Sequence, residues 1–145
     1  MSLKSMASHN EELKDCWKSG MQALQKKDKK LIRSPKSVCN GSINIDACLE
    51  NSRPNDNRWD YGLDIKDKGV FVEVHPAHTS EVNTILAKLT WLKSWFQRNC
   101  SGFNSLNKSY YWVASGAVAI RQGSPQARRL AREGITGQLK YLNLE

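Results

Sequence analysis

Long apolar stretches are missing from this sequence of 145 residues. A membrane-spanning helix needs roughly 20 consecutive apolar residues, and a secretory signal needs an apolar core, which the polar N-terminal residues do not supply. We therefore expect no membrane partner and a cytoplasmic protein. Residues 1–3 and 144–145 resemble residues left over from cloning. We therefore expect residues 1–9 and 144–145 to be flexible or to come from the cloning vector.

Closely spaced cysteine pairs are also absent. The four cysteines are widely spread along the chain, at Cys16, Cys39, Cys48 and Cys100. Without a CxxC pair, neither a zinc knuckle nor a thioredoxin-type motif is indicated, and we expect reduced, mostly buried thiols.

Acidic residues are in deficit. Fourteen Asp and Glu stand against 22 Lys and Arg, which gives a net charge of +8. The excess favours polyanionic partners such as nucleic acid, because clustered Lys and Arg release counterions when they bind phosphates. With 39% hydrophobic and 25% charged residues the composition is ordinary for a folded protein. We expect a single domain over residues 1–145, since a chain of this length can bury about two-thirds of its surface.

Apolar spacing predicts the first half of the fold. A three- and four-residue repeat (Leu13, Trp17, Met21, Leu24) predicts an amphipathic helix over 10–27. A basic segment follows and is closed by Ser34 and Pro35, which we interpret as a solvated linker. Alternation of apolar and polar residues predicts a strand over 43–49, and the polar stretch 51–57 predicts a loop.

The second half begins with a β-hairpin, formed by residues 59–66 and 70–74 around a turn at 67–69. Pro76 ends the second strand, and a helix capped by Thr79 or Ser80 runs to about Arg98. A strand from Tyr110, a helix between Ser124 and Gly134, and a strand over 138–142 complete the chain. The order predicts an α/β (α+β) fold with a central mixed sheet of four to five strands flanked by helices.

The hairpin sorts its side chains by face. Residues 61, 63 and 65 and residues 70, 72 and 74 are all apolar, so they form one face. The opposite face carries Asp60, Asp64, Glu73 and His75. A two-residue turn at Lys68 and Gly69 would place Asp64 directly across from Glu73.

Two facing carboxylates repel each other unless a cation lies between them. Mg²⁺ or Mn²⁺ is one candidate, because one or two carboxylates with water and phosphate ligands suffice to hold Mg²⁺. Asp60, Asp64 and Glu73 are the expected metal ligands. The alternative is that Lys66, Lys68 or an arginine neutralises the carboxylates, or that the face is simply solvated.

At these residues the chain resembles the PD-(D/E)XK nuclease superfamily, whose core is a helix, a three-stranded meander, a crossover helix and a fourth strand. The resemblance implies that Asp60 or Asp64 is the motif aspartate and that Glu73-Val74-His75 is the (D/E)-x-K triplet. His75 replaces the lysine that orients the attacking water or stabilises charge. Glu12 is a possible accessory acid from the first helix.

Neutral histidine supplies no fixed positive charge, but it can bind a metal or act as a base instead. His78 follows three residues after His75, so Glu73, His75 and His78 form an alternative Mn²⁺ or Zn²⁺ set. A hydrogen-bonded loop is the ordinary alternative for two such histidines.

The long helix and the next one carry candidate binding residues. Helical spacing places Lys88, Trp91, Trp95 and Arg98 together, opposite the apolar stripe. We expect Trp91 and Trp95 to be buried against protein, inside the chain or in a homodimer, in preference to stacking on bases. Lys88 and a second cluster, Arg128, Arg129 and Arg132, are candidate phosphate contacts, although such clusters are usually solvated.

Three functions remain open from the sequence. The leading hypothesis is a metal-dependent nuclease that hydrolyses phosphodiester bonds in DNA or RNA, with His75 positioning or deprotonating water. The second is an inactive nuclease-fold module that binds protein or nucleic acid, motivated by His75 and the tryptophans. The third is a small regulatory partner such as an antitoxin.

Overall fold

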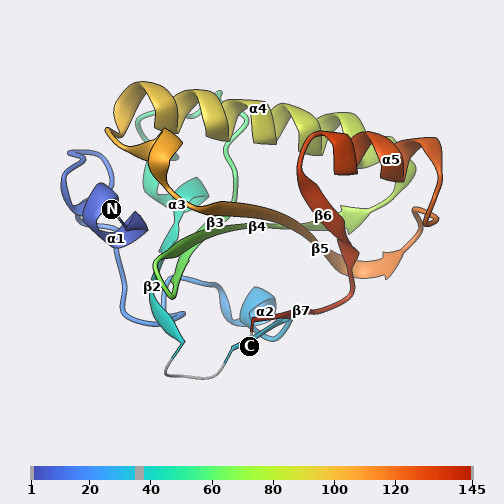
Figure 1. Ribbon diagram of the computed structural model, residues 1–145, viewed down its shortest axis with the longest axis horizontal. Coiled ribbons are helices and arrows are strands. Elements are labelled where there is room, and N and C mark those ends of the chain that lie inside the picture. The colour runs from blue at the N-terminus through green and yellow to red at the C-terminus, as the bar shows by residue number, and fades with distance from the viewer. Residues whose placement is uncertain (1, 35–37, 145) are drawn as a thin grey trace.

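A five-stranded mixed sheet forms the centre of the protein in the computed structural model, which describes residues 2–34 and 38–144 (Figure 1). Its strand order is β2-β3-β4-β5-β6. The first two pairings are antiparallel and the last two are parallel. The strands are β2 (Cys39–Asn44), β3 (Tyr61–Ile65), β4 (Lys68–Ala77), β5 (Lys108–Val118) and β6 (Ile135–Leu139). The predicted mixed fold with helices on a four- to five-stranded sheet is confirmed.

Helices cover both faces of the sheet. α4 (Val82–Asn99) and α5 (Pro125–Arg132) lie on one face, and α2 (Lys26–Lys29) lies on the other beside a small parallel pair (Figure 1). That pair consists of β1 (Ile32–Arg33) and β7 (Leu142–Asn143). The remaining helices are α1 (Leu3–Ser8), α3 (Ile45–Leu49), and the 3₁₀ turns η1 (Thr79–Glu81) and η2 (Phe103–Ser105).

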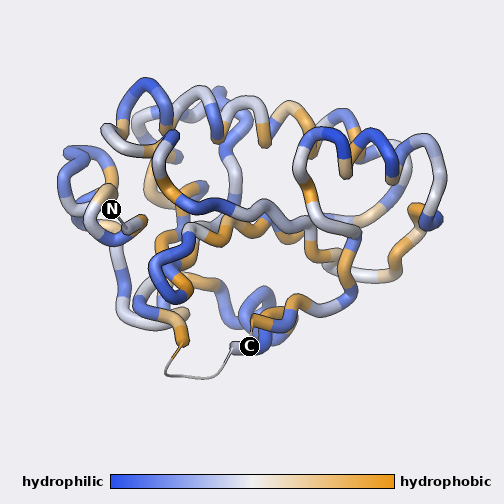
Figure 2. Tube along the Cα trace, in the orientation of Figure 1, coloured by the Kyte–Doolittle hydropathy of each residue, from blue (hydrophilic) through white to orange (hydrophobic). Residues whose placement is uncertain are grey.

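Two apolar clusters follow from this layering. Between the sheet and α4, Phe71 and Phe96 pack edge to face, and Trp112 is fully buried beside them. On the opposite face, the apolar side of the hairpin contributes Leu63 and Val72 to a second cluster. Figure 2 shows the apolar residues of α4 turned toward the sheet and its polar residues turned outward. The face sorting predicted for the hairpin therefore organises both clusters.

The predicted helix over 10–27 is wrong. Lys18 forms an isolated antiparallel bridge with Ser42, and Gly20 adopts a positive φ of 51°, which interrupts helical hydrogen bonding. Trp17 packs against β2 so closely that a Cβ on Gly41 would lie 2.4 Å from the indole. Leu13 and Leu24 are both buried, but in different clusters. The spaced apolar residues therefore pack into two separate apolar clusters and do not form one stripe of a helix.

The predicted strand over 43–49 is right only at its beginning. The Asn44 side chain accepts a hydrogen bond from Ala47 N–H at 3.0 Å, and the Asp60 carbonyl accepts one from Ile45 N–H at 2.8 Å. These two contacts cap the first turn of α3, so the chain turns into a helix after Asn44. Residues 138–142 also differ from prediction, because β6 ends at Leu139 and β7 starts at Leu142.

The later elements agree with the sequence. α4 occupies the predicted long helix, but the cap predicted at Thr79 or Ser80 is wrong, because both residues lie in η1 and no described side chain caps the start of α4. Ser124 caps α5 by accepting from Ala127 N–H at 3.1 Å. Gly134, with φ of 92°, follows the end of α5. Pro76 does not end β4, which continues to Ala77 with a register shift at this position. The predicted linker residues Pro35 and Lys36 lie outside the described residues.

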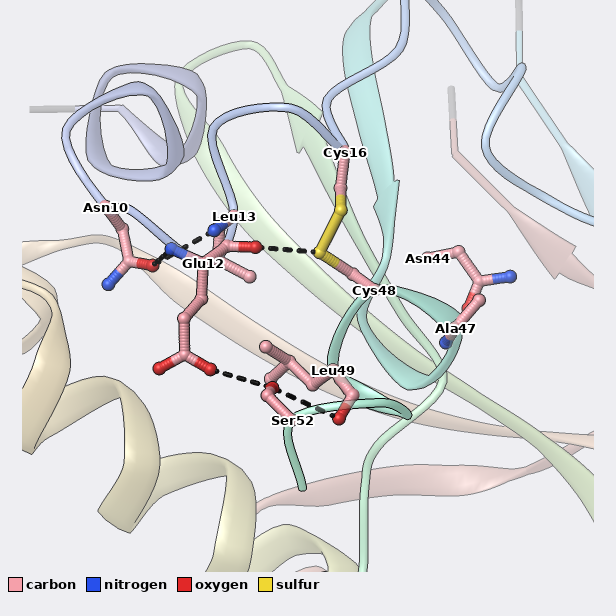
Figure 3. The surroundings of a disulfide bond; sticks show 9 residues. All are labelled: Asn10, Glu12, Leu13, Cys16, Asn44, Ala47, Cys48, Leu49 and Ser52. Atoms are coloured by element: carbon pink, nitrogen blue, oxygen red, sulfur yellow. Dashed lines mark hydrogen bonds between the residues drawn. A yellow bond between two sulfur atoms is a disulfide. The ribbon is translucent and has the colours of Figure 1, made fainter. Parts of the chain in front are cut away.

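The expectation of reduced cysteines is wrong for Cys16 and Cys48. They form a disulfide that ties the N-terminal segment to α3 (Figure 3). Cys39 and Cys100 are free and buried, as expected. Disulfides are uncommon in reducing compartments, so this pair gives no support to the expected cytoplasmic location.

The N-terminal residues that we expected to be flexible are part of the fold. Leu3, Met6 and Ala7 on α1 are buried in the main apolar cluster. At the other end, Leu144 is buried and its N–H donates to the Arg33 carbonyl at 2.7 Å, while Glu145 lies outside the described residues. No helix within 2–34 or 38–144 is long and apolar enough to cross a membrane.

Candidate functional site

The polar face of the hairpin is as predicted, but its register is not. The chain turns at Lys66 and Asp67, which both adopt a positive φ, and not at Lys68 and Gly69. Tyr61 consequently pairs with Val72, and Asp64 pairs with Gly69. The residue opposite Glu73 is therefore Asp60, at the start of β3.

Asp60, Glu73 and Lys88 form the centre of the candidate site. The Glu73 side chain is 0% exposed. Its Oε1 accepts a hydrogen bond from the Asp60 N–H at 3.1 Å, and its Oε2 accepts one from the Lys88 ammonium at 2.5 Å. The Asp60 carboxylate in turn accepts from the Val74 N–H at 3.0 Å. Lys88 thus binds Glu73 directly, and its charge also acts on the neighbouring Asp60 carboxylate.

The electrostatics of this centre are unfavourable to two anions. Burial, and then the charge of Asp60, raise the pKa of Glu73 to about 8, although Lys88 opposes the shift. Burial also raises the pKa of Asp60 above its ordinary value, against the opposing charge of Lys88. Burial alone would lower the pKa of Lys88, but the Glu73 carboxylate, with Asp60 and Asp46, outweighs burial and raises that pKa. An additional cation would relieve the remaining negative charge.

His75 lies beside the centre and is held by a second acid. Its Nε2 is 2.9 Å from Glu81 Oε2, and its Nδ1 is 3.7 Å from Glu73 Oε2. The Trp112 indole N–H donates to the His75 carbonyl at 3.0 Å, which fixes the backbone at this point.

A polar cleft opens beside Asp60. It has a volume of about 620 Å³, and its walls include Asp46 and Asp60 from the ends of α3 and β3, and Lys27 and Asp28 from α2. Val74 and Pro76 of β4 and Ser115 of β5 complete the sheet side of the cleft. These are the carboxyl-terminal halves of two parallel strands, where open sheets of this type commonly bind ligands.

Asp64 is not part of this site. It is 1% exposed, and its Oδ2 accepts a hydrogen bond from the Lys4 N–H in the first turn of α1 at 3.3 Å. Four residues separate its cross-strand position from Glu73, which is about 13 Å along a strand. The predicted Asp64–Glu73 pair is therefore wrong, because it depended on the turn position.

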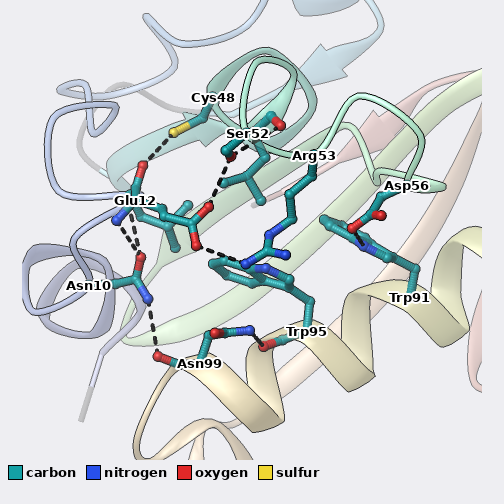
Figure 4. Close-up of polar contacts among 11 residues, drawn as sticks. Asn10, Glu12, Cys48, Ser52, Arg53, Asp56, Trp91, Trp95 and Asn99 are labelled. Atoms are coloured by element: carbon teal, nitrogen blue, oxygen red, sulfur yellow. Dashed lines mark hydrogen bonds and ion pairs between the residues drawn. The ribbon is translucent and has the colours of Figure 1, made fainter.

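The predicted accessory residues lie elsewhere. Glu12 binds Arg53 at 3.0 Å and accepts from the Ser52 hydroxyl at 2.9 Å, so it holds the 51–57 loop (Figure 4). His78 is exposed ahead of η1, while the Nε2 of His75 faces Glu81. In the part of the chain that the structure describes, no three His, Cys, Asp or Glu side chains are grouped to hold a metal. A metal at the hairpin would have Asp60 and Glu73 as its carboxylates.

The tryptophans of α4 are packed inside the chain. Trp95 is 1% exposed, with the Arg53 guanidinium 5.8 Å from its ring centre, and the Trp91 N–H donates to Asp56 at 2.8 Å (Figure 4). Residues Arg53 and Asp56 of the 51–57 loop thus contact the two tryptophans. Trp91 and Trp95 thus pack against other residues of the same chain, and buried Trp95 is not available to a partner.

Lys88 was assigned to the outer face of α4 together with Arg98, and that placement is wrong. Lys88 lies three residues after buried Ile85 and four before buried Leu92, so it reaches the sheet. This spacing could have identified it. Glu81 was missed altogether, because no cross-strand rule links it to His75.

The arginine cluster of α5 is exposed, as expected for a solvated helix face. Arg129 donates to Asn83 at 2.6 Å, and Arg129 and Arg132 line a pocket of about 370 Å³ beside the start of α4. Arg128 lines an adjacent pocket with Arg132. None of the three reaches the centre formed by Asp60, Glu73 and Lys88 through a described contact.

Comparison with known proteins identifies no relative of this chain, so a functional conclusion depends on the geometry described above. No protein-family model matches the chain, and neither a curated protein nor a solved structure shows significant similarity to it.

Proposed function

We propose that the protein is a metal-dependent nuclease of the PD-(D/E)XK type that hydrolyses phosphodiester bonds in DNA or RNA. The observation that carries the proposal is the buried Glu73 carboxylate, which faces Asp60 across two strands and binds the Lys88 ammonium. An aspartate, a glutamate and a lysine are the three functional groups that the resemblance requires. The lysine comes from α4 instead of the residue two positions after Glu73.

The order of elements also supports the proposal. β2, β3 and β4 form an antiparallel meander, α4 crosses over the sheet, and β5 returns parallel to β4. The resemblance implies the same succession of meander, crossover helix and parallel strand. The acidic centre lies on the two hairpin strands next to that crossover.

Asp60 and Glu73 fit a divalent cation by charge and donor type. Burial raises the pKa of both carboxyl groups although the charge of Lys88 opposes the shift, so the site favours a further cation. Mg²⁺ or Mn²⁺ bound there would neutralise charge that develops on the phosphate and would make a bound water more acidic.

The chain's own residues then have separate tasks. Lys88 keeps a positive charge beside Glu73, where it can stabilise the phosphate or orient water. His75, held by Glu81 at 2.9 Å, can accept or return a proton at the edge of the same centre. The Val74 and Asp60 backbone N–H groups fix the two carboxylates in place.

The test is cleavage of labelled single-stranded DNA, duplex DNA and RNA with Mg²⁺ or Mn²⁺, comparing Asp60→Asn with Asp64→Asn. Both aspartates lie on the same face of β3, but only Asp60 belongs to the site. We expect Asp60→Asn and Glu73→Gln to lose at least about 100-fold in rate and Asp64→Asn to keep full activity.

Circular dichroism of each variant would show that the fold is retained. Equal cleavage by Asp60→Asn and Asp64→Asn would indicate a contaminant and would overturn the proposal. Absence of cleavage in the unmodified chain on all three substrates with both metals would do the same.

A further inference from the structure

A run of exposed lysines on and just after α2 reaches the cleft that contains Asp60 through one of its members, Lys27. Lys26, Lys27, Lys29 and Lys30 are all exposed on α2 and directly after it, and we call residues 26–30 the lysine segment. Lys27 lines the cleft together with Asp46 and Asp60. No ion pair joins any of these four lysines to a carboxylate within 2–34 and 38–144.

The lysine segment is fixed to the sheet and is not a free linker. Leu24 and Ile32, which flank it, are 6% and 4% exposed in the second apolar cluster. Its one acid, Asp28, turns inward and accepts a hydrogen bond from the Tyr61 hydroxyl at 2.6 Å, and the same hydroxyl accepts from the Gln25 N–H. The parallel pair β1–β7 holds the chain immediately after it. The backbone that carries the four lysines is therefore held at a defined place beside the sheet.

Their position complements the charge of the site. Asp28, Asp46 and Asp60 all line the cleft, so a phosphodiester chain that enters it meets negative charge. Lysine is a point charge that binds phosphate oxygens without a fixed orientation, and it releases counterions when it does so. Lys27 in the wall of the cleft, with the other lysines of the segment next to it in the chain, offsets the repulsion that the carboxylates exert on a polyanion.

We propose that the lysine segment binds the phosphate backbone of a polynucleotide and guides the strand across the cleft beside Asp60. The identity of the ligand rests on the proposed function, whereas the place of binding rests on the anchored lysines. The segment contacts several consecutive phosphates, so a polynucleotide binds far better than a single phosphate group.

The experiment measures binding of fluorescein-labelled single-stranded DNA, duplex DNA and RNA by anisotropy, with EDTA present to prevent cleavage. Lys27→Gln/Lys30→Gln removes two charges from the lysine segment. Lys66→Gln/Lys68→Gln removes the same charge at the hairpin turn, at the opposite end of β3 from Asp60. The first variant should bind at least about 10-fold more weakly at 0.1 M salt. Its slope of log affinity against log salt should fall by about 1.5, since each phosphate contact contributes roughly 0.7 to 0.9.

The hairpin variant should keep the affinity and the salt slope of the unmodified chain. Equal losses in both variants would show an effect of net charge alone and overturn the proposal, as would unchanged binding in the lysine-segment variant or no binding by the unmodified chain. Inorganic phosphate added at the same phosphate concentration should not compete; competition would indicate a site for a single phosphate. Binding through the segment without any cleavage would refute the nuclease function and leave this inference standing.

Discussion

Glu73 is the residue on which the properties of the site depend. Its carboxyl group is buried between Asp60 and Lys88, and its pKa is raised from an ordinary value of 4.5 to about 8. Below pH 4.5 it is protonated in both the folded and the unfolded chain. Between these values the unfolded chain loses the proton while the folded chain keeps it, so rising pH favours unfolding.

Glu73→Gln should therefore gain stability relative to the unmodified chain as the pH rises from about 4.5 to 8. Urea unfolding of both proteins across this range would measure the difference in free energy of unfolding. At pH 8, Mn²⁺ should raise the midpoint of thermal unfolding of the unmodified chain only, because ligand binding stabilises the folded state. A difference that does not change with pH would contradict the burial of this carboxyl group.

For single residues of the hairpin, the sequence predicts which face of the sheet each side chain lies on, but not which residues of the two strands pair. The alternation of a strand is enough to place Asp60, Glu73 and His75 on one face. Register depends on which residues turn, and Lys66-Asp67 is not one of the pairs, such as Asn-Gly or Asp-Gly, that predict a two-residue turn. Lys88 escapes prediction for a related reason, because a charged residue on the border of an apolar stripe is ordinarily assigned to solvent.

Among the helices, strands and turns, the hairpin turn is the place where a substitution should increase the stability of the fold. Lys66 and Asp67 adopt φ of 51° and 66°, the left-handed region that costs a residue with a Cβ about 1 to 2 kcal/mol. Lys66→Asn/Asp67→Gly supplies the residues that a two-residue turn of this type prefers. We expect the free energy of unfolding to rise by about 1 kcal/mol.

Urea unfolding would measure that gain. The slope of the free energy of unfolding against urea concentration should be the same for the double variant and the unmodified chain. The matched control is Lys68→Gly, which places glycine in the extended strand and should destabilise the fold. If the double variant were less stable, the hairpin would turn elsewhere, and Asp60 would no longer face Glu73.

Elements with strong local signals were predictable, and those held by distant contacts were not. α4 has a long apolar periodicity, and α5 has a capping residue of its own, Ser124. The segment before β1 has the periodicity but not the helix, because Cys16 binds Cys48 and Lys18 pairs with Ser42. No local rule can report those partners.

For the whole molecule, the disulfide is the strongest single constraint on the unfolded chain. Cys16 and Cys48 are separated by 32 residues, and closing a loop of that size stabilises a fold by about 3 to 4 kcal/mol in the chain-entropy description. Reduction, or Cys16→Ser/Cys48→Ser, should lower the free energy of unfolding by about 2 to 4 kcal/mol.

Urea unfolding with and without a reducing agent would measure the loss. Cys39→Ser is the control, since Cys39 is a free, buried thiol and its substitution leaves the cross-link intact. The response of the Cys39→Ser protein to reduction should equal that of the unmodified chain, and a Cys16→Ser/Cys48→Ser protein should not respond at all. A protein whose stability is the same in both redox conditions would refute the constraint.

The small pair β1–β7 should form late in folding. Ile32 pairs with Leu142, so these two short strands meet only after nearly the whole intervening chain has been brought together. Contacts between positions so distant in sequence form slowly and open readily when they are few. Backbone amides of β7 should therefore exchange with deuterium sooner than those of β4 and β5. The lysine segment, which β1 follows, would be among the last parts of the molecule to reach its final place.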